Sequence, residues 1–318
     1  MVIRCYEQFF VSLITFSITV TGVLINIIVL LAIKKSKSMS GAFGIITKNQ
    51  AVCNIIMCLI FLLVNFPLQL SSFPPLIAHS HYFGTAIMSV YEISNLSHFL
   101  ISFNRFCLLY MPHYYERVFS NSKTVLWRNM LWLSSIIFCV YFYEIIDCNF
   151  SYNPPSWTFE FKTTELCNQV SWYMDFIFNT TVMIVTLFVN LLTAKKGRRK
   201  SRRLINAAGL QLSKVQLRRE WNFVKQTFFQ GLSMILSQFS YYVVAPVISD
   251  HYPILLFFVA TLWAFMHAAE GGIILASNQE LRSVYKKSEL IPELLRIILA
   301  SNKELRSVFK KMSTVAPG

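Results

Sequence analysis

Long stretches without a charged side chain alternate with short charged segments along this chain. Asp, Glu, Lys and Arg are all absent from residues 8–33, 49–91, 129–143, 176–194, 226–249 and 251–269. A helix needs about 20 mostly apolar residues to cross the hydrocarbon core of a bilayer, so these runs predict membrane-spanning helices. The run 49–91 has room for two helices, because Pro67, Pro74 and Pro75 mark a turn within it.

We therefore predict an all-α fold, a bundle of seven transmembrane helices joined by short loops. The predicted helices are 9–33, 44–66, 83–110, 126–146, 171–192, 226–248 and 254–276. They leave an N-terminal stub at 1–8 and a tail at 277–318, with the seven-helix transmembrane domain at 9–276. Composition agrees, because residues of the AVILMFWYC set make up 55% of the chain and charged residues only 14%. Soluble domains carry roughly 25% charged residues, so a soluble domain or a disordered chain is excluded.

Basic side chains are concentrated on one side of this predicted bundle. Of the 29 Lys and Arg, only Arg4 and Lys162 fall on the other side. The positive-inside rule then places the N-terminus outside and the tail in the cytoplasm. The net charge of +14 is accounted for by this topology and by contact with anionic membrane lipids. Nucleic-acid binding is a poor explanation, since the basic residues flank membrane spans.

Acidic side chains inside a membrane are costly and therefore indicate function. Glu92 lies in the outer half of the predicted helix 83–110 and is our first choice for contact with a polar ligand. Glu144 and Asp175 are expected near the outer ends of their helices, where contact with water explains them.

Aromatic and His side chains extend this candidate ligand site. Tyr241 lies on the predicted helix 226–248, and Trp263 and His267 are i, i+4 neighbours on one face of the last helix. We predict that these three residues bind ligand together with Glu92, although packing in the core is the commoner role of such side chains.

An internal polar network is predicted between the first, second and last helices. Gly22 favours close contact between helices, and the amides of Asn26 and Asn54 are suited to bond to each other across them. Glu270 lies in the inner part of the last helix, beside two glycines. We expect it to join this network and to report the conformational state, while the two amides are interpreted first as structural.

The outer loop between the fourth and fifth helices contains Cys148 and Cys167. Because this loop faces an oxidising compartment, we predict a disulfide between them, with two free thiols as the alternative. Asn149 begins the N-x-S sequence of this loop and is the expected glycan acceptor. None of the 6 His residues has metal-ligand spacing with Cys or an acid, so we expect neither a metal nor a cofactor.

The tail contains an internal repeat. The sequence IILASNQELRSVYKK at 273–287 returns as IILASNKELRSVFKK at 297–311. The second copy is too short and too charged to span a membrane and is predicted to form an amphipathic helix on the inner leaflet. A local duplication, or an error in the gene model, explains the near identity more simply than a function does.

Several of these stretches together resemble the nematode serpentine receptor class X (Srx) chemoreceptors, a divergent branch of the rhodopsin-like superfamily. They are GIITKNQAVCN (44–54), SFNRFCLLYMP (102–112), WNFVKQTFFQGL (221–232) and EGGIILASNQELR (270–282). The resemblance covers residues 9–287 and excludes the second copy of the repeat.

The resemblance implies a G-protein-coupled receptor in the plasma membrane of sensory neurons, in their cilia. Such a receptor detects an environmental or pheromone-like small molecule and signals to a heterotrimeric G protein. Rhodopsin-like receptors carry an acid-Arg-aromatic motif where this chain has Asn104 and Arg105, so Arg105 is implied to face the G protein. The acid is replaced by Asn104, which removes the ionic restraint on the arginine. Snorkelling to the membrane interface is the alternative role of Arg105.

Other classes of function fit the sequence less well. The chain lacks HExxH, GxSxG and a glycine-rich phosphate loop, so an enzyme is not expected. The alternative function is a ligand-gated ion channel or transporter built on seven helices. Insect-type odorant channels share the number of spans but place the N-terminus inside, so the orientation distinguishes the two hypotheses.

Overall fold

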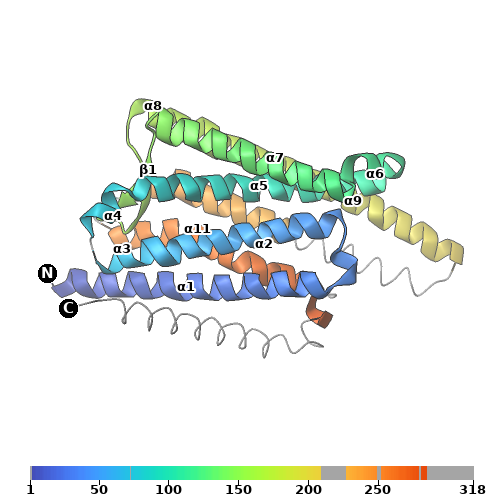
Figure 1. Cartoon of the computed structure of the whole chain (residues 1–318), viewed down its shortest axis with the longest axis horizontal. Coiled ribbons are helices and arrows are strands. Elements are labelled where there is room, and N and C mark those ends of the chain that lie inside the picture. Colours follow the sequence, from blue (N-terminus) through green and yellow to red (C-terminus); the bar gives the residue numbers. More distant parts are fainter. Residues whose placement is uncertain (1, 72, 209–226, 249–251, 279–280, 285–318) are drawn as a thin grey trace, which may run out of the picture.

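The computed structural model describes residues 2–71, 73–208, 227–248, 252–278 and 281–284. Within them the chain forms a bundle of seven long helices that lie side by side (Figure 1). This arrangement confirms the predicted all-α seven-helix fold. The second copy of the repeat, most of the tail, and the central part of the loop between the fifth and sixth helices lie outside the described residues.

The helices of the bundle follow the predicted order. The first two are α1 (Val2–Lys35) and α2 (Ala42–Ile60), which continues through a π-helical segment (Phe61–Asn65) into α3 (Phe66–Leu70). The third and fourth are α5 (Ser80–Tyr110) and α7 (Asn121–Cys139), and α7 ends in a π-helical segment (Val140–Ile145). The last three are α9 (Phe178–Ala208), the sixth helix at 227–239 and α11 (Pro253–Ser277). The short elements are η1 (Lys37–Met39), α4 (Pro74–Ala78), α6 (Pro112–Phe119), α8 (Glu165–Val170), η4 (Ser171–Ile177), η5 (Ser240–Val244) and η6 (Ala245–Val247).

Several helices run further than their apolar patterns predict. α1 begins at Val2 rather than at residue 9, and α9 continues to Ala208 rather than ending at residue 192. The physical reason is that charged side chains end a membrane span without ending a helix. Lys and Arg are good helix formers, so the basic segment after Ala194 stays helical beyond the apolar run.

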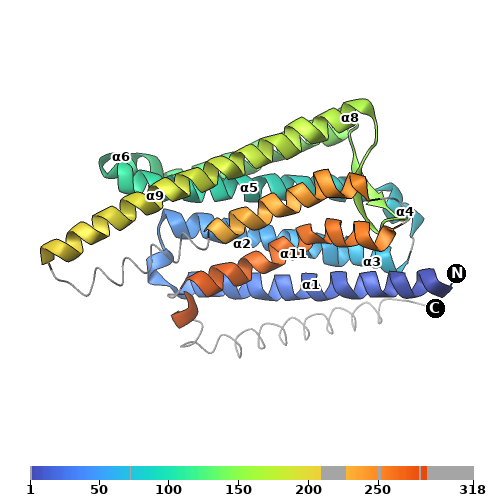
Figure 2. The ribbon, with the colours of Figure 1, turned by 180° about the vertical axis from the view of Figure 1, so that it is seen from behind.

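α5 occupies the centre of the bundle and packs against α2, α7 and α9. Figure 2 shows the sixth helix, in light orange, between α9 and α11. Five helical stretches of the described chain have the length and mean hydropathy of membrane spans, and α5 is not among them. Its buried side chains include many Ser, Asn and His residues together with Glu92. The central helix therefore supplies the polar groups of the interior.

The outer loop forms a hairpin that is inserted into one end of the bundle. β1 (Phe150–Asn153) pairs antiparallel with β2 (Thr158–Phe161), and Phe150 lies opposite Phe161. The hairpin backbone passes so close to α5 that a Cβ added at Gly84 would lie 1.6 Å from the carbonyl oxygen of Phe150. Ser80 Oγ accepts a hydrogen bond from the backbone N–H of Tyr152 at 3.0 Å. These contacts fix the hairpin as a lid over the bundle.

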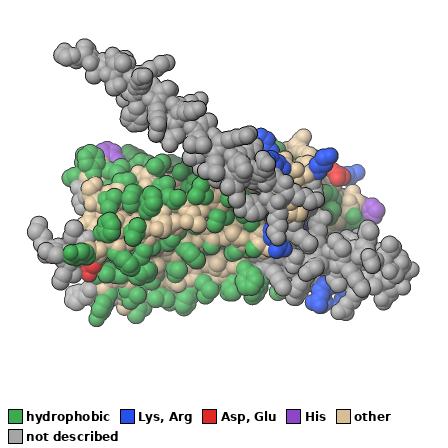
Figure 3. Space-filling model, turned by 90° about the horizontal axis from the view of Figure 1, so that it is seen from below, with side chains coloured by type: hydrophobic (Ala, Val, Ile, Leu, Met, Phe, Trp, Pro, Cys, Tyr) green, Lys and Arg blue, Asp and Glu red, His purple; other side chains and the backbone are tan. Residues whose placement is uncertain are grey.

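The surface of the bundle matches a membrane environment. Large apolar side chains such as Leu133, Phe188 and Phe265 are more than half exposed. Figure 3 shows hydrophobic side chains spread over the face of the molecule that it presents. The described Lys and Arg residues gather at one end of that view. This is the end that carries α6 and the tip of α9, opposite the hairpin (Figure 1).

Candidate functional site

The bundle contains a cluster of buried acidic and amide side chains near the hairpin, which we call the acidic cluster. It consists of Glu92, Asn95, Asp175, Asn179 and Tyr242. Glu92 and Asn95 are one turn apart on α5, and Asp175 and Asn179 are one turn apart where η4 meets α9. Spacings of three and four residues place side chains on the same helix face, so α5 and α9 present matching pairs to each other.

One amide connects the two acids of this cluster. Asn179 Nδ2 donates to Glu92 Oε1 and, at 2.8 Å, to Asp175 Oδ1. The Tyr242 hydroxyl donates to Asp175 Oδ2, and Asn95 Nδ2 donates to Asn179 Oδ1. Both carboxylates are almost completely inaccessible to water, with 2% exposure at Glu92 and 0% at Asp175.

The burial of Asp175 corrects the expectation that contact with water explains this acid. The π-helical segment Ser171–Ile177 holds Asp175 inside the bundle. A π-helical turn contains more residues than an α-helical turn and is frequently found at functional sites. The expectation used only the position of Asp175 near the end of its helix, which does not tell whether the side chain points into the bundle. Glu144 does lie near the surface, where it bonds to His81 Nδ1 at 3.0 Å.

Aromatic rings lie directly beside the acidic cluster. The rings of Tyr241 and Trp263 are stacked, with centroids 5.6 Å apart and planes within 4°. Tyr91 contacts the ring of Trp263 at 4.8 Å, and Phe150 of the hairpin contacts it at 5.8 Å. Three of the four predicted ligand-binding residues, Glu92, Tyr241 and Trp263, are thus brought into one region.

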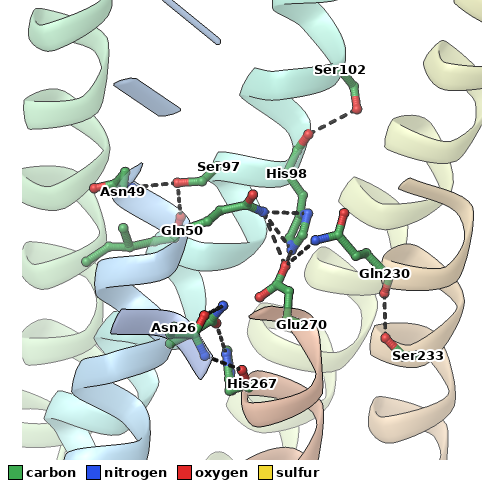
Figure 4. A network of polar contacts seen from close by, with 12 residues as sticks. Asn26, Asn49, Gln50, Ser97, His98, Ser102, Gln230, Ser233, His267 and Glu270 are labelled. Carbon is green, nitrogen blue, oxygen red and sulfur yellow. Dashed lines mark hydrogen bonds and ion pairs between the residues drawn. The ribbon is translucent and has the colours of Figure 1, made fainter. Parts of the chain in front are cut away.

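A second group of buried polar residues lies deeper in the bundle, and we call it the inner network (Figure 4). Its centre is Glu270 of α11, whose Oε1 lies 2.6 Å from His98 Nε2 of α5. Gln230 Nε2 of the sixth helix donates to the same oxygen at 3.0 Å. Gln50 Nε2 of α2 contacts the His98 ring at 2.7 Å and Glu270 at 3.4 Å. Four helices therefore meet at one carboxylate.

The same network continues to α1. Asn54 Nδ2 donates to Asn26 Oδ1 at 3.2 Å, and His267 Nδ1 lies 2.8 Å from Asn54 Oδ1. Asn26 Nδ2 in turn donates to the backbone oxygens of Gly22 and His267. The two amides expected to face each other do so. His267 lies among the residues of the inner network, and its contact with a ligand stays a prediction.

A side branch of polar contacts connects the network to α7. Asn49 Nδ2 donates to Ser97 Oγ at 2.9 Å, and Trp132 Nε1 donates to Asn49 Oδ1 at 2.7 Å. Asn49 and Gln50 are adjacent in α2, so this branch and the contacts of Glu270 originate at the same turn of that helix.

The inner end of α5 holds the pair predicted to face a G protein. Asn104 Nδ2 donates to the Tyr115 hydroxyl of α6 at 3.2 Å. The guanidinium of Arg105 is partly buried and lies over the ring of Phe43, 4.8 Å from its centroid. This contact is a cation–π interaction between α5 and α2. Asn104 thus holds α6 against α5 at the position of the missing acid.

The outer loop carries the remaining predicted sites. Cys148 and Cys167 are joined by a disulfide, with Cα atoms 5.0 Å apart. Asn149 is partly buried and donates to Asp147 Oδ1; its glycosylation remains a prediction. Among the described residues no group of three or more His, Cys, Asp and Glu side chains is arranged to hold a metal ion.

Sequence patterns missed several residues that the structure brings together. They are Gln50, Asn95, His98, Asp175, Asn179 and Gln230. Most are amides within the predicted helices. The available signal was that an amide in a membrane span is costly unless it finds a partner. The pairing itself depends on how the helices are rotated.

Comparisons with known proteins agree with this architecture. The family described as "Serpentine type 7TM GPCR chemoreceptor Srx" matches residues 16–278. "Serpentine receptor class X 45" of Caenorhabditis elegans is 25% identical over 307 residues, which cover 90% of this chain and 83% of the relative. "Serpentine receptor class X-43" of the same organism is 22% identical over 268 residues, 82% of each chain.

Among solved structures, squid rhodopsin has a similar fold. The TM-score is 0.74 at 13% sequence identity, and the match covers 92% of this chain and 87% of rhodopsin. At this identity the likeness concerns the arrangement of the helices alone.

Proposed function

The chain belongs to the Srx family of serpentine seven-transmembrane chemoreceptors, and on this premise we propose that it detects a small environmental or pheromone-like molecule and signals to a heterotrimeric G protein. The plasma membrane of sensory neurons, at their cilia, is the proposed location. The family and the rhodopsin-like fold favour a receptor over the channel or transporter considered as the alternative.

One observation carries the proposal: α5 connects the outer region, the inner network and the inner end of the bundle. Glu92 belongs to the acidic cluster, His98 to the inner network, and Arg105 to the inner end. A ligand that binds one arrangement of the helices more tightly shifts a pre-existing equilibrium towards it. Because the polar contacts of α5 involve α2, α9, α11 and the sixth helix, a shift of α5 at the outer end changes partners at the inner end.

Basic side chains at the inner end support the proposed contacts with lipid head groups and a G protein. Lys195, Lys196, Arg198 and Arg199 lie on α9 where it leaves the apolar run, and all four are exposed. Clusters of Lys and Arg beside a membrane attract anionic lipids, by about 1 kcal/mol per residue near the surface. We assign these residues to the lipid surface and Arg105 to the G protein.

Replacing Arg105 by Ala tests the proposal. The receptor is expressed in cells with a promiscuous G protein, and a library of small molecules is screened for calcium responses. R105A is expected to lose the responses while labelling of intact cells shows normal surface delivery. R117A is the matched control, because Arg117 is a second cation on the same side that lies over the ring of Tyr114. Equal responses in R105A and the native receptor would remove Arg105 from this role.

A further inference from the structure

The acidic cluster has properties that specify the chemical class of the ligand. We infer that it recognises an organic cation, an amine whose positively charged nitrogen binds Glu92 and Asp175. This inference rests on the receptor function proposed above and narrows the ligand from any small molecule to one that carries a positive charge. The argument uses the charge of the cluster, its unfilled hydrogen-bonding groups and its aromatic neighbours.

The two carboxylates have no cationic partner. Across the described parts of the chain, no Lys, Arg or His forms an ion pair with Glu92 or Asp175. The buried Glu270 is paired with His98, and Glu144 is paired with His81. A buried charge without a partner is expensive. Glu270 and Glu144 therefore each pair with a His, whereas Glu92 and Asp175 do not.

The oxygens of Glu92 and Asp175 can accept more hydrogen bonds than the surrounding side chains donate to them. The amide of Asn179 is shared between both carboxylates, and the Tyr242 hydroxyl serves only Asp175. Two further groups are buried without any hydrogen-bond partner, the hydroxyl of Tyr143 and Oδ1 of Asn95. Buried polar groups are normally paired, so the site has places for hydrogen bonds that a ligand can fill.

Tyr143 belongs to this site by position. Its side chain is 1% exposed, and its ring lies 5.7 Å from that of Phe161, which is 6.4 Å from the ring of Tyr242 in the cluster. Asn95 is connected to the two carboxylates through Asn179. The unpaired groups and the unpaired charges therefore face one region between α5, the end of α7 and the start of α9.

Aromatic faces beside the cluster distinguish an organic cation from a metal ion. The ring of Tyr242 lies 5.1 Å from that of Tyr241, which is stacked on Trp263, and Tyr91 contacts Trp263 from α5. Aromatic faces attract alkylammonium groups by about 0.5–2 kcal/mol. The described residues provide no metal-binding group of three or more ligands. The hairpin covers the region with Phe150, and the exclusion of water strengthens the attraction between opposite charges.

Thermal unfolding of the purified receptor tests the inference without any signalling readout. The probes are aryl and alkyl amines, including 2-phenylethylamine and its trimethylammonium analogue, each beside its uncharged alcohol and its carboxylic acid. At least one amine is expected to raise the melting temperature, and its alcohol is not. A ligand stabilises the folded state by an amount that grows with concentration over Kd, so a titration gives the apparent affinity.

Substitutions of the acids then locate the binding site. E92Q and D175N keep the side-chain shape, and each is expected to weaken amine binding about tenfold or more, since a hydrogen bond to a charged group is worth roughly one to two powers of ten. E144Q is the matched control, because that acid lies in the same half of the bundle but is paired with His81. It is expected to bind the amine as the native receptor does.

The outcomes separate this inference from the receptor function. If no amine stabilises the native receptor, if only neutral or anionic probes do, or if E92Q and D175N leave amine affinity unchanged, the inference is wrong. The receptor function survives each of these results provided that some ligand evokes a response that R105A removes. Melting of the ligand-free variants provides the check on folding. Both E92Q and D175N are expected to melt at or above the native temperature, since each removes an unpaired buried charge.

Discussion

Two adjacent glycines of α11 provide a sharp test of the helix packing. A Cβ added at Gly271 would lie 2.8 Å from Asn26 Oδ1 and 2.9 Å from Ile25 Cγ2, whereas nothing lies within 4 Å of a Cβ added at Gly272. Both substitutions by Ala change the same helix in the same way, so their intrinsic effect on helix formation cancels in the comparison. The difference in stability between G271A and G272A therefore measures the closeness of α1 and α11.

The expected difference follows from the contacts. Extra atoms in a well-packed interior cost about 1–3 kcal/mol. The obstructing group is Asn26, whose Oδ1 accepts the hydrogen bond from Asn54, and loss of that bond adds about 1 kcal/mol. We expect G271A to be less stable than G272A by about 2–4 kcal/mol, the sum of these two contributions. G272A itself is expected to melt at or slightly above the native temperature.

Thiol labelling during heating measures this difference. Cys53, Cys58 and Cys139 are free and buried, so a maleimide dye reports unfolding of the purified receptor in detergent. G22A is an independent check, because its Cβ would lie 2.7 Å from Ala268 Cβ on the other side of the same interface. Equal melting temperatures for G271A and G272A would refute the close contact of α1 and α11.

Three further predictions concern the outer loop. Replacing Cys148 and Cys167 by Ser is expected to cost about 3 kcal/mol, because the disulfide joins residues 19 apart, and melting under non-reducing conditions measures it. G84V is expected to lift the hairpin from α5, since even a Cβ there overlaps a carbonyl oxygen, and limited proteolysis detects the released hairpin. Lys162 donates to Asp147 and lowers the pKa of this carboxyl. The pair therefore stabilises the fold above the ordinary pKa of Asp and loses this contribution as the pH falls, so K162Q should weaken the acid dependence of the melting temperature.

Matched variants define what would contradict these expectations. C107S leaves the disulfide intact and should melt close to the native receptor, and a similar loss in C107S and in the double variant would refute the role of the bond. G41A adds a Cβ with nothing within 4 Å and should leave the hairpin resistant to protease. If K162Q and the native receptor respond equally to acid, the ion pair contributes nothing to stability. The effect is expected to be small, because both side chains are exposed.

The fold was predictable because a membrane imposes a simple rule on composition. Spans must be long and apolar, and basic residues mark one side, so seven helices could be located without any knowledge of their contacts. The exceptions are informative. α5 is the central helix and is too polar to qualify as a span by mean hydropathy; the 43-residue uncharged run that precedes Glu92 still revealed its first half.

The polar interior was predictable only in part. The contact between Asn26 and Asn54 follows from two amides at similar depth in neighbouring helices. The partners of Glu270 do not, because His98 and Gln230 are far away in sequence and their meeting depends on helix rotation. Asp175 was misjudged because nearness to a helix end does not tell which way a side chain points, and the π-helical segment holds this one inside the bundle. Periodicity at 3.6 residues contains no information on such segments.

The length of α9 has a mechanical consequence. At 1.5 Å per residue, its 31 residues extend for about 46 Å, while the hydrocarbon layer is about 30 Å thick. Several turns therefore project past the lipid as a stiff arm (Figure 2). A tilt of the membrane-embedded part of α9 moves its tip further than its base. A displacement of a fraction of an ångström beside Asn179 therefore becomes a larger displacement of the tip, where it can affect a bound protein.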